Sequence, residues 1–180
     1  MSRHLDVQEK VYEELQEVFG DSDRVVSYED LSRLAYLDAV VKESLRLYPV
    51  VPILGRHVDK DVVLPTGLTI VKDCGILVNV WAIHRNPAYW GEDADQFRPE
   101  RFLDYTPKHP AAFMPFSYGS RNCVGYRYAM ILMKTVLSTL LRRYRVLPPP
   151  GVAQGEQLRT QFDMILRHVG NYEIRLERRK

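Results

Sequence analysis

Apolar residues near the start of the chain recur at steps of three and four, which is the spacing of one face of an α-helix. The residues with this spacing are Val11, Leu15, Val18 and Phe19. The pattern predicts an amphipathic helix over residues 5–19, with Asp6 as its N-cap and Gly20 as its stop signal.

Two further helices are predicted by capping and stop signals in the segment that follows. Ser27 and, three residues later, Asp30 form the pattern of a capping box, which predicts a short helix over 28–34. A second helix is expected over 36–47. It should end before Pro49, because the proline ring disfavours helical backbone in the preceding residue.

Between residues 56 and 80 the helical pattern gives way to short runs of β-branched residues, separated by turn sequences at 65–67 and 73–75. These runs predict three short strands of a small sheet. Asn86-Pro87 then opens a turn or short helix, and the next thirty residues have no steady period. An irregular connection of this length is usually functional.

The longest helical pattern covers residues 124–143, and its broad apolar face predicts a buried or nearly buried helix. After a proline-rich break, apolar and polar residues alternate over 162–167 and 172–176 around Gly170-Asn171, which predicts a β-hairpin. The order of helices, strands, long helix and hairpin predicts a mixed α+β fold, mainly α, without internal repeats.

The composition allows one domain or a piece of one, because 180 residues with 46% hydrophobic content can bury one core. The 25 basic and 23 acidic side chains are spread along the chain, so no nucleic-acid partner is expected. The first ten residues lack the apolar core of a signal peptide, and no apolar run reaches the roughly 20 residues that span a bilayer. We therefore expect a soluble chain, unless an upstream segment is missing.

The chain has two cysteines, Cys74 and Cys123, and neither has a second Cys or His at a zinc-like spacing. This argues against a disulfide framework or a structural zinc site, and it leaves Cys74, in a turn between predicted strands, without an expected role. His57 and His84 lack a helical partner for a metal, so surface or packing roles are expected for them.

Cys123 lies at the start of the long predicted helix, directly after a loop that contains Gly119 and Arg121. Backbone N–H groups of a first helical turn, together with the helix dipole, favour a thiolate over a thiol. Arg121 adds positive potential and is shaped to bind a carboxylate such as a haem propionate. Gly119 and Gly125 permit close approach of backbone to a flat cofactor, and Phe116 supplies an aromatic wall. The arrangement suits a metal-bound thiolate held against a macrocycle.

The pattern Phe116-x-x-Gly119-x-Arg121-x-Cys123-x-Gly125 resembles the haem-binding signature of the cytochromes P-450, the haem-thiolate monooxygenases. The resemblance implies haem b as cofactor, with Cys123 as its catalytic iron ligand and the other four residues as cofactor contacts. In the alternative interpretation, Cys123 is a buried, inert cysteine at a helix start and the chain is an interaction domain.

Glu43-x-x-Arg46 lies on the predicted helix over 36–47, where a spacing of three lets the two side chains pair. Arg101, within Pro99-Glu100-Arg101-Phe102, is similar to the residue that completes a Glu-Arg-Arg cluster in the family. The resemblance implies that Glu43, Arg46 and Arg101 are structural supports that lock the thiolate loop. It also implies that Arg56 reaches a haem propionate.

The family lines its substrate pocket with segments that correspond to residues 50–54 and 168–171 here. The candidate pocket residues are Val51, Ile53, Leu54 and Val169. Ordinary core packing is the alternative for 50–54. Residues 51–56, 113–117 and 121–123 look most like the microsomal family-four branch, which hydroxylates fatty acids and related lipophilic molecules, although Tyr118 and Ser120 depart from the commoner Ala and Pro there.

The resemblance implies a C–H hydroxylation that uses dioxygen and electrons from NADPH-cytochrome P-450 reductase, on a lipophilic small molecule such as a fatty acid, hormone or xenobiotic. The full-length form would lie in the endoplasmic reticulum membrane or, alternatively, the mitochondrial inner membrane. No distal oxygen-activating motif and no anchor helix are found in the sequence. We therefore expect residues 1–180 to form the C-terminal part of a single domain that is inactive alone. The alternative is a truncated, non-catalytic haem-binding protein.

Overall fold

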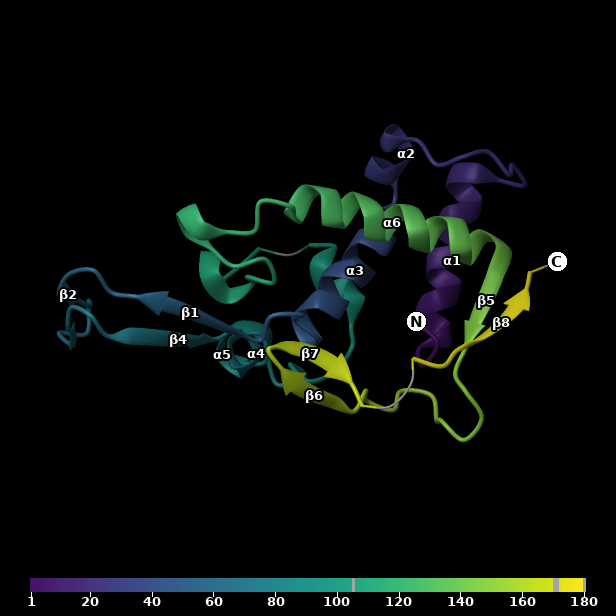
Figure 1. The fold of residues 1–180 in the computed structure, drawn as a ribbon. Helices are drawn as coiled ribbons and strands as arrows, with labels where there is room; N and C mark the ends of the chain where they lie inside the picture. Colours follow the sequence, from purple (N-terminus) through teal and green to yellow (C-terminus); the bar gives the residue numbers. More distant parts are fainter. Residues whose placement is uncertain (105, 170–171, 180) are drawn as a thin grey trace.

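The computed structural model describes residues 1–104, 106–169 and 172–179. Three longer helices lie at its centre: α1 (Leu5–Phe19), α3 (Ala35–Leu47) and α6 (Tyr126–Arg143). Figure 1 shows α6 lying across α1 and α3, while strands β1 and β4 project away from the helices on one side. The prediction of a mixed α+β fold, mainly α, is confirmed.

The remaining elements are short. The other helices are α2 (Tyr28–Arg33), α4 (Val80–Ile83), α5 (Pro87–Trp90) and the 3-10 helices η1 (Pro99–Phe102), η2 (Pro110–Ala112) and η3 (Gly119–Arg121). The strands are β1 (Ile53–His57), β2 (Val62–Val63), β3 (Thr69–Ile70), β4 (Gly75–Asn79), β5 (Tyr144–Leu147), β6 (Thr160–Asp163), β7 (Ile165–His168) and β8 (Arg175–Arg178). No helix among the described residues has the length and apolar character needed to cross a bilayer.

The first two predicted helices are confirmed, with one change at a cap. α1 has His4 rather than Asp6 at its N-cap, and Asp6 lies in the first turn, where a negative charge is favoured by the helix dipole. Gly20 ends α1 with φ +54°, and its N–H donates to the Gln16 carbonyl at 2.8 Å. The capping box of α2 is formed in both directions between Ser27 and Asp30.

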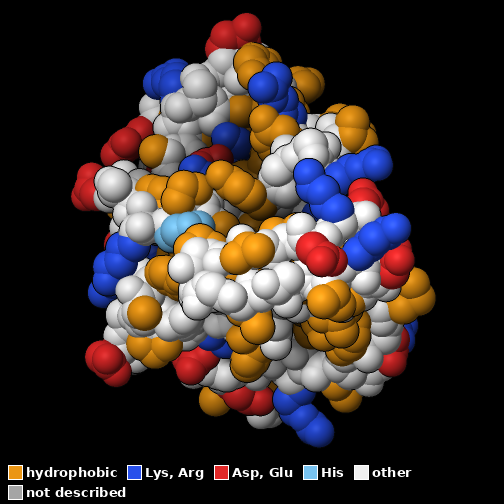
Figure 2. Space-filling view, turned by 90° about the vertical axis from the view of Figure 1, so that its left-hand side faces the viewer, with side chains coloured by type: hydrophobic (Ala, Val, Ile, Leu, Met, Phe, Trp, Pro, Cys, Tyr) orange, Lys and Arg blue, Asp and Glu red, His pale blue; other side chains and the backbone are white. Residues whose placement is uncertain are grey.

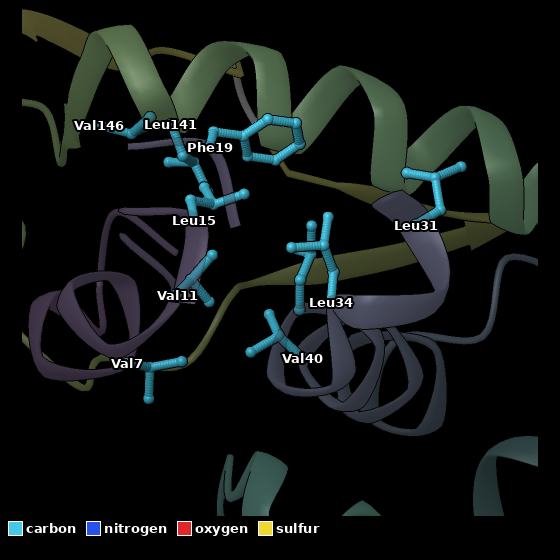
Figure 3. Close-up of a cluster of buried hydrophobic side chains, with 10 residues drawn as sticks. Val7, Val11, Leu15, Phe19, Leu31, Leu34, Val40, Leu141 and Val146 are labelled. Atoms are coloured by element: carbon cyan, nitrogen blue, oxygen red, sulfur yellow. The ribbon is translucent and has the colours of Figure 1, made fainter. Parts of the chain in front are cut away.

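The core lies between α1, the α2–α3 pair and α6. Figure 3 shows side chains from these helices pointing toward one another. The buried residues of this cluster are Val7, Val11, Leu15, Phe19, Leu31, Leu34, Leu37, Val40, Leu141 and Val146. The apolar face that predicted α1 is therefore the face that packs, and this packing fixes α3 and α6, the two helices that flank the candidate site.

The prediction of a buried or nearly buried long helix is wrong. Only Ser138 and Leu141 of α6 are buried, whereas Leu132 and Val136 are 46% and 54% exposed. α6 packs one side against α1, α2 and α3, and its other apolar side has no covering element among the described residues. The helix also begins at Tyr126, two residues later than predicted.

The prediction of three strands in one sheet is also wrong, because the segment forms four strands in two separate pairs. β1 pairs antiparallel with β4, from Ile53 opposite Asn79 to His57 opposite Gly75. β2 and β3 form a second, two-residue ladder beyond them, closed by a turn in which Gly67 has φ +83°. The turn at 65–67 thus closes a small hairpin of its own at the tip of β1 and β4.

The predicted C-terminal hairpin is wrong in its pairing. β6 pairs with β7 around Met164, which has φ +68°, so the hairpin lies within 160–168. β8 pairs instead with β5, directly after α6. The predicted turn at residues 170–171 lies outside the described residues. Alternation of apolar and polar residues predicts a strand but does not specify its partner.

Candidate functional site

The segment that carries Cys123 is a compact loop between η3 and α6. The Cys123 N–H donates to the Phe116 carbonyl at 2.8 Å, and the Asn122 N–H donates to the Gly119 carbonyl at 3.1 Å. Gly119 has φ +83°, a conformation that side chains with a Cβ rarely adopt, so the predicted need for glycine in this turn has a backbone reason. The loop therefore holds the cysteine backbone through its own hydrogen bonds.

The Cys123 thiol is exposed and none of the hydrogen bonds among the described residues involves its sulfur. Because α6 begins at Tyr126, the thiol precedes the first helical turn, and the stabilisation of a thiolate by N–H groups of that turn stays a prediction. A Cβ on Gly125 would lie 4.0 Å from the sulfur, which places this glycine against the thiol. The alternative of a buried, inert cysteine does not agree with this exposure.

The other predicted cofactor contacts surround the loop. Phe116 is half-buried and its ring lies 6.3 Å from that of Tyr126. Arg121 is exposed, and no described residue forms a hydrogen bond or ion pair with its guanidinium. Arg56, on β1, donates from Nη2 to Ser117 Oγ at 2.7 Å. The structure therefore brings the β1–β4 pair to the Cys123 loop and leaves one guanidinium beside it unpaired.

Arg46 lies at the centre of a buried cluster behind this loop. Its Nε and Nη2 donate to the two carboxylate oxygens of Glu43 at 2.7 and 2.9 Å. Its Nη1 donates to the carbonyls of His84 and Ala94 at 2.7 and 2.6 Å. Nη2 also donates to the Gln96 carbonyl at 3.1 Å. All five N–H groups of the guanidinium are thus bonded, which offsets the cost of burying its charge.

Arg101 joins the same carboxylate from the 3-10 helix η1. Its Nε donates to Glu43 Oε1 at 3.0 Å, and its Nη1 and Nη2 donate to the carbonyls of Trp90 and Asp93, both at 3.2 Å. The backbone N–H of Arg98 donates to Glu43 Oε1 at 2.8 Å. The predicted grouping of Glu43, Arg46 and Arg101 is therefore formed, and it ties α3 to the irregular segment that precedes the Cys123 loop.

His84 is a component of this region whose role the sequence did not indicate. It is fully buried, one ring nitrogen lies 3.1 Å from the Arg46 carbonyl, and the other accepts the backbone N–H of Met114 at 2.9 Å. Burial is the main cause that lowers its pKa to about 4. Both partners are backbone groups distant in sequence, so no local pattern marks this residue.

The hairpin that leads into the candidate pocket residue Val169 contacts the candidate pocket segment 50–54. The backbone N–H of Leu166, on β7, donates to the Val50 carbonyl at 2.8 Å, and this bond joins the β6–β7 hairpin to the segment before β1. Val51 and Val169 are both exposed, and Ile53 and Leu54 are half-buried. Ordinary core packing, the alternative for 50–54, does not describe Val51 here. Figure 2 views the molecule from the side of β1 and β4 and shows hydrophobic side chains around a hollow in this face.

The family comparison agrees with this loop and cluster: the family model of Cytochrome P450 matches residues 1–176. The chain belongs to the cytochrome P450 family, whose members are haem-thiolate monooxygenases.

Its relatives refine this placement. Probable cytochrome P450 4p2 of Drosophila melanogaster is 40% identical over 181 residues, covering 99% of this chain and 34% of its own length. Cytochrome P450 4V2 of Mus musculus is 41% identical, over 97% of this chain and 33% of its own. Cytochrome P450 4F2 of Homo sapiens is 38% identical, over 98% and 34%. The predicted resemblance to family four is confirmed, and the chain spans about a third of the length of these relatives.

Cys123 is the one thiol at the loop, which suits a single protein ligand to a cofactor metal better than a metal site built from several side chains. Among the described residues, no group of three or more His, Cys, Asp or Glu side chains is placed to hold a metal ion. An exposed single thiol can complete a metal whose other ligands come from a planar cofactor. The residues present at the Cys123 loop therefore fit a haem.

Proposed function

We propose that the chain forms the thiolate side of a haem-thiolate monooxygenase site, with Cys123 as the axial ligand of haem b. The observation that carries the proposal is the exposed Cys123 thiol, presented by a loop whose backbone is fixed by the 2.8 Å bond to Phe116. The loop lies within the five-position signature of the family. When bound, the haem supplies dioxygen activation and C–H oxidation.

The residues of this chain have distinct proposed roles toward that cofactor. The Cys123 thiolate would hold the iron and would supply electron density to it. Arg121, which has no partner among the described residues, and Arg56, held next to the loop through Ser117, bind the propionates. The backbone at Gly119 and Gly125 allows close approach of the haem ring. The Phe116 side chain is the remaining proposed contact and forms an aromatic wall beside the cofactor.

In this proposal the Glu43, Arg46 and Arg101 cluster acts on the cofactor indirectly, through the segment that leads to the Cys123 loop. It binds carbonyls at residues 84, 90, 93, 94 and 96, and so fixes the irregular segment that leads to the loop. A loop whose backbone is already fixed loses less conformational entropy when the cofactor binds. These three residues are positioning residues and do not touch the cofactor.

The substrate in this proposal is a lipophilic small molecule, such as a fatty acid, hormone or xenobiotic, bound near Val51, Ile53, Leu54 and Val169. Similarity to family four and the exposed apolar residues of this segment support the choice. Dioxygen is the co-substrate, and electrons come from NADPH-cytochrome P-450 reductase. We place the full-length form in the endoplasmic reticulum membrane, with the mitochondrial inner membrane as the alternative.

We propose that these 180 residues do not turn over substrate by themselves. An exposed apolar stripe begins at Val124, just before α6, and continues along the helix through Tyr128, Leu132 and Val136. In a full-length protein the rest of the chain would cover this stripe and supply the distal wall that excludes water. The exposure of this stripe also favours a second candidate function, that of a truncated haem-binding protein without catalysis.

A reduced-carbonyl difference spectrum of the haem-reconstituted chain tests the ligand. The wild type and the matched control Cys74→Ala should show the Soret band typical of thiolate ligation, and Cys123→Ala should lose it. An unchanged spectrum in Cys123→Ala would overturn the proposal.

A second assay tests the activity of the isolated chain. Fatty-acid hydroxylation with NADPH and reductase should be absent for these 180 residues and present for a full-length form. A clear rate from the 180 residues would contradict the proposed inactivity, and no rate from a full-length form that binds haem would favour the non-catalytic candidate.

A further inference from the structure

His84 and Arg46 bind each other twice, in opposite directions. The Arg46 guanidinium donates from Nη1 to the His84 carbonyl at 2.7 Å, and the His84 Nδ1 lies 3.1 Å from the Arg46 carbonyl. Both residues are fully buried. The imidazole also lies against the Phe113 ring, with centroids 5.4 Å apart. His84 is therefore held between α3 and the segment that leads into the Cys123 loop.

The two partners of the imidazole define its protonation. Met114 contributes a backbone N–H, which can only donate, so His84 Nε2 must carry a lone pair. The Arg46 carbonyl can only accept, so Nδ1 must carry the hydrogen. The ring is thus the neutral tautomer protonated at Nδ1, with both nitrogens used.

A short series of backbone bonds connects this ring to the cysteine. Met114, bound through its N–H to His84, accepts the Ser117 N–H through its carbonyl at 3.1 Å. Phe116, between them, accepts the Cys123 N–H at 2.8 Å. Met114 is itself buried. Residues 114–117 are therefore fixed at one end by His84 and at the other by the loop.

We infer that His84 is a positioning residue for the thiolate loop, acting as a neutral hydrogen-bond bridge from the Arg46 carbonyl on α3 to the backbone of Met114. The inference rests on the proposed role of Cys123 as haem ligand. It adds to the Glu43, Arg46 and Arg101 cluster a direct contact with the segment that presents the cysteine, which none of those three side chains makes.

The surroundings keep the bridge neutral. Burial lowers the pKa of His84 most, the Arg46 and Leu45 carbonyls raise it, and the positive charges of Arg46 and Arg85 lower it. The 113–117 segment that packs against the ring contains Phe, Met, Pro and Ser residues only, so it contributes no titratable side chain. A second proton would place Nε2–H against the Met114 N–H, so protonation would break the bridge.

Nitrogen NMR of the wild-type chain tests the bridge directly. The imidazole of His84 should be neutral and protonated at Nδ1 down to about pH 5, given a pKa of about 4. A signal from the Nε2-protonated tautomer, or from an imidazolium at neutral pH, would overturn the inference without reference to any variant.

Two substitutions separate the two halves of the bridge. His84→Gln places a carbonyl oxygen near the position of Nε2, and His84→Asn keeps a donor near Nδ1 but no acceptor for Met114. Amide exchange at Met114 and Cys123 should accelerate roughly tenfold in His84→Asn, as expected for the loss of one buried hydrogen bond, and much less in His84→Gln. His57→Gln, with an exposed side chain, is the matched control and should match the wild type. Equal exchange in all three variants would overturn the inference.

The haem-reconstituted variants separate this inference from the proposed function. The thiolate-type fraction of the reduced-carbonyl spectrum should fall in His84→Asn and be largely kept in His84→Gln. If the wild type and His84→Asn both show the same thiolate spectrum, the inference about His84 is overturned and the proposed function is not. A wild type that binds haem without a thiolate spectrum would end the proposed function, while the NMR and exchange results would still decide the bridge.

Discussion

The Glu43, Arg46 and Arg101 cluster and the Cys123 loop differ in how complete they are within this chain. Every N–H group of Arg46 is bonded and the Glu43 carboxylate accepts from Arg46, Arg101 and Arg98. In contrast, the Cys123 thiol and the Arg121 guanidinium are exposed and have no partner among the described residues. The polar groups of the cluster are therefore satisfied by contacts within this chain, whereas the loop leaves a thiol and a guanidinium exposed, as the proposed haem site requires.

Among the substitutions considered, removal of Arg46 should lower the stability of the chain most. Arg46→Ala leaves the Glu43 carboxylate buried with one guanidinium fewer and frees three carbonyls, so the free energy of unfolding should fall by about 3–5 kcal/mol. Urea denaturation measures the change. Arg33→Ala, on the exposed face of α2, is the matched control and should leave the midpoint unchanged. A loss in Arg46→Ala as small as in the control would contradict the cluster's structural role.

Acidification should weaken the same region through His84. Its pKa is about 4 in the folded chain and about 6.5 when unfolded, so the unfolded state binds more protons between these values. Stability should therefore fall as pH falls from about 6.5 to 4, by up to about 3 kcal/mol, and level off below. The measurement is the difference between wild type and His84→Gln across this range. A difference that is constant with pH would disagree with the buried neutral imidazole.

Arg101→Lys should have a smaller effect because it keeps the positive charge. A lysine cannot reproduce the fork that binds Glu43, Trp90 and Asp93 together, so a loss of about 1–2 kcal/mol is expected. Thermal unfolding gives this value, and Arg98→Lys, whose side chain is largely exposed, is the control. Equal losses in the two variants would show that the fork geometry of Arg101 does not matter.

Cys123→Ala should be the mildest change for stability. The thiol is exposed and no hydrogen bond among the described residues involves it, so the free energy of unfolding should change by less than about 0.5 kcal/mol. The same variant should lose thiolate ligation of added haem. A large loss of stability would mean that the cysteine supports the loop, and the contrast between loop and cluster would then fail.

The sequence predicted the parts of the fold that depend on nearby residues. The apolar spacing in α1, the capping box of Ser27 and Asp30, and the pairing of Glu43 with Arg46 all act within four residues, and all are present. The site residues with a family pattern also come together, including Arg101, although that grouping followed from the resemblance and not from spacing.

The wrong predictions concern contacts between distant segments. The apolar pattern of α6 gives the width of its face but not what covers it, so burial was overestimated. The C-terminal hairpin was assigned to a Gly-Asn pair, while the chain turns at Met164, a residue type that rarely has positive φ. His84 was expected to have a surface or packing role, and its bridging contacts were not predicted because its partners are backbone groups at residues 46 and 114, which leave no signature in a sequence.

The bond from Arg46 to the Ala94 carbonyl joins residues 48 positions apart. It closes one large loop that contains the β1–β4 and β2–β3 pairs. Closing such a loop costs an entropy that grows only with the logarithm of its length, about 0.6 kcal/mol for each doubling. The β2–β3 tip lies far along this loop from its closure and its residues are largely exposed. Insertions or deletions there should be tolerated, so the chain can vary in length at this tip while the cysteine loop keeps its supports.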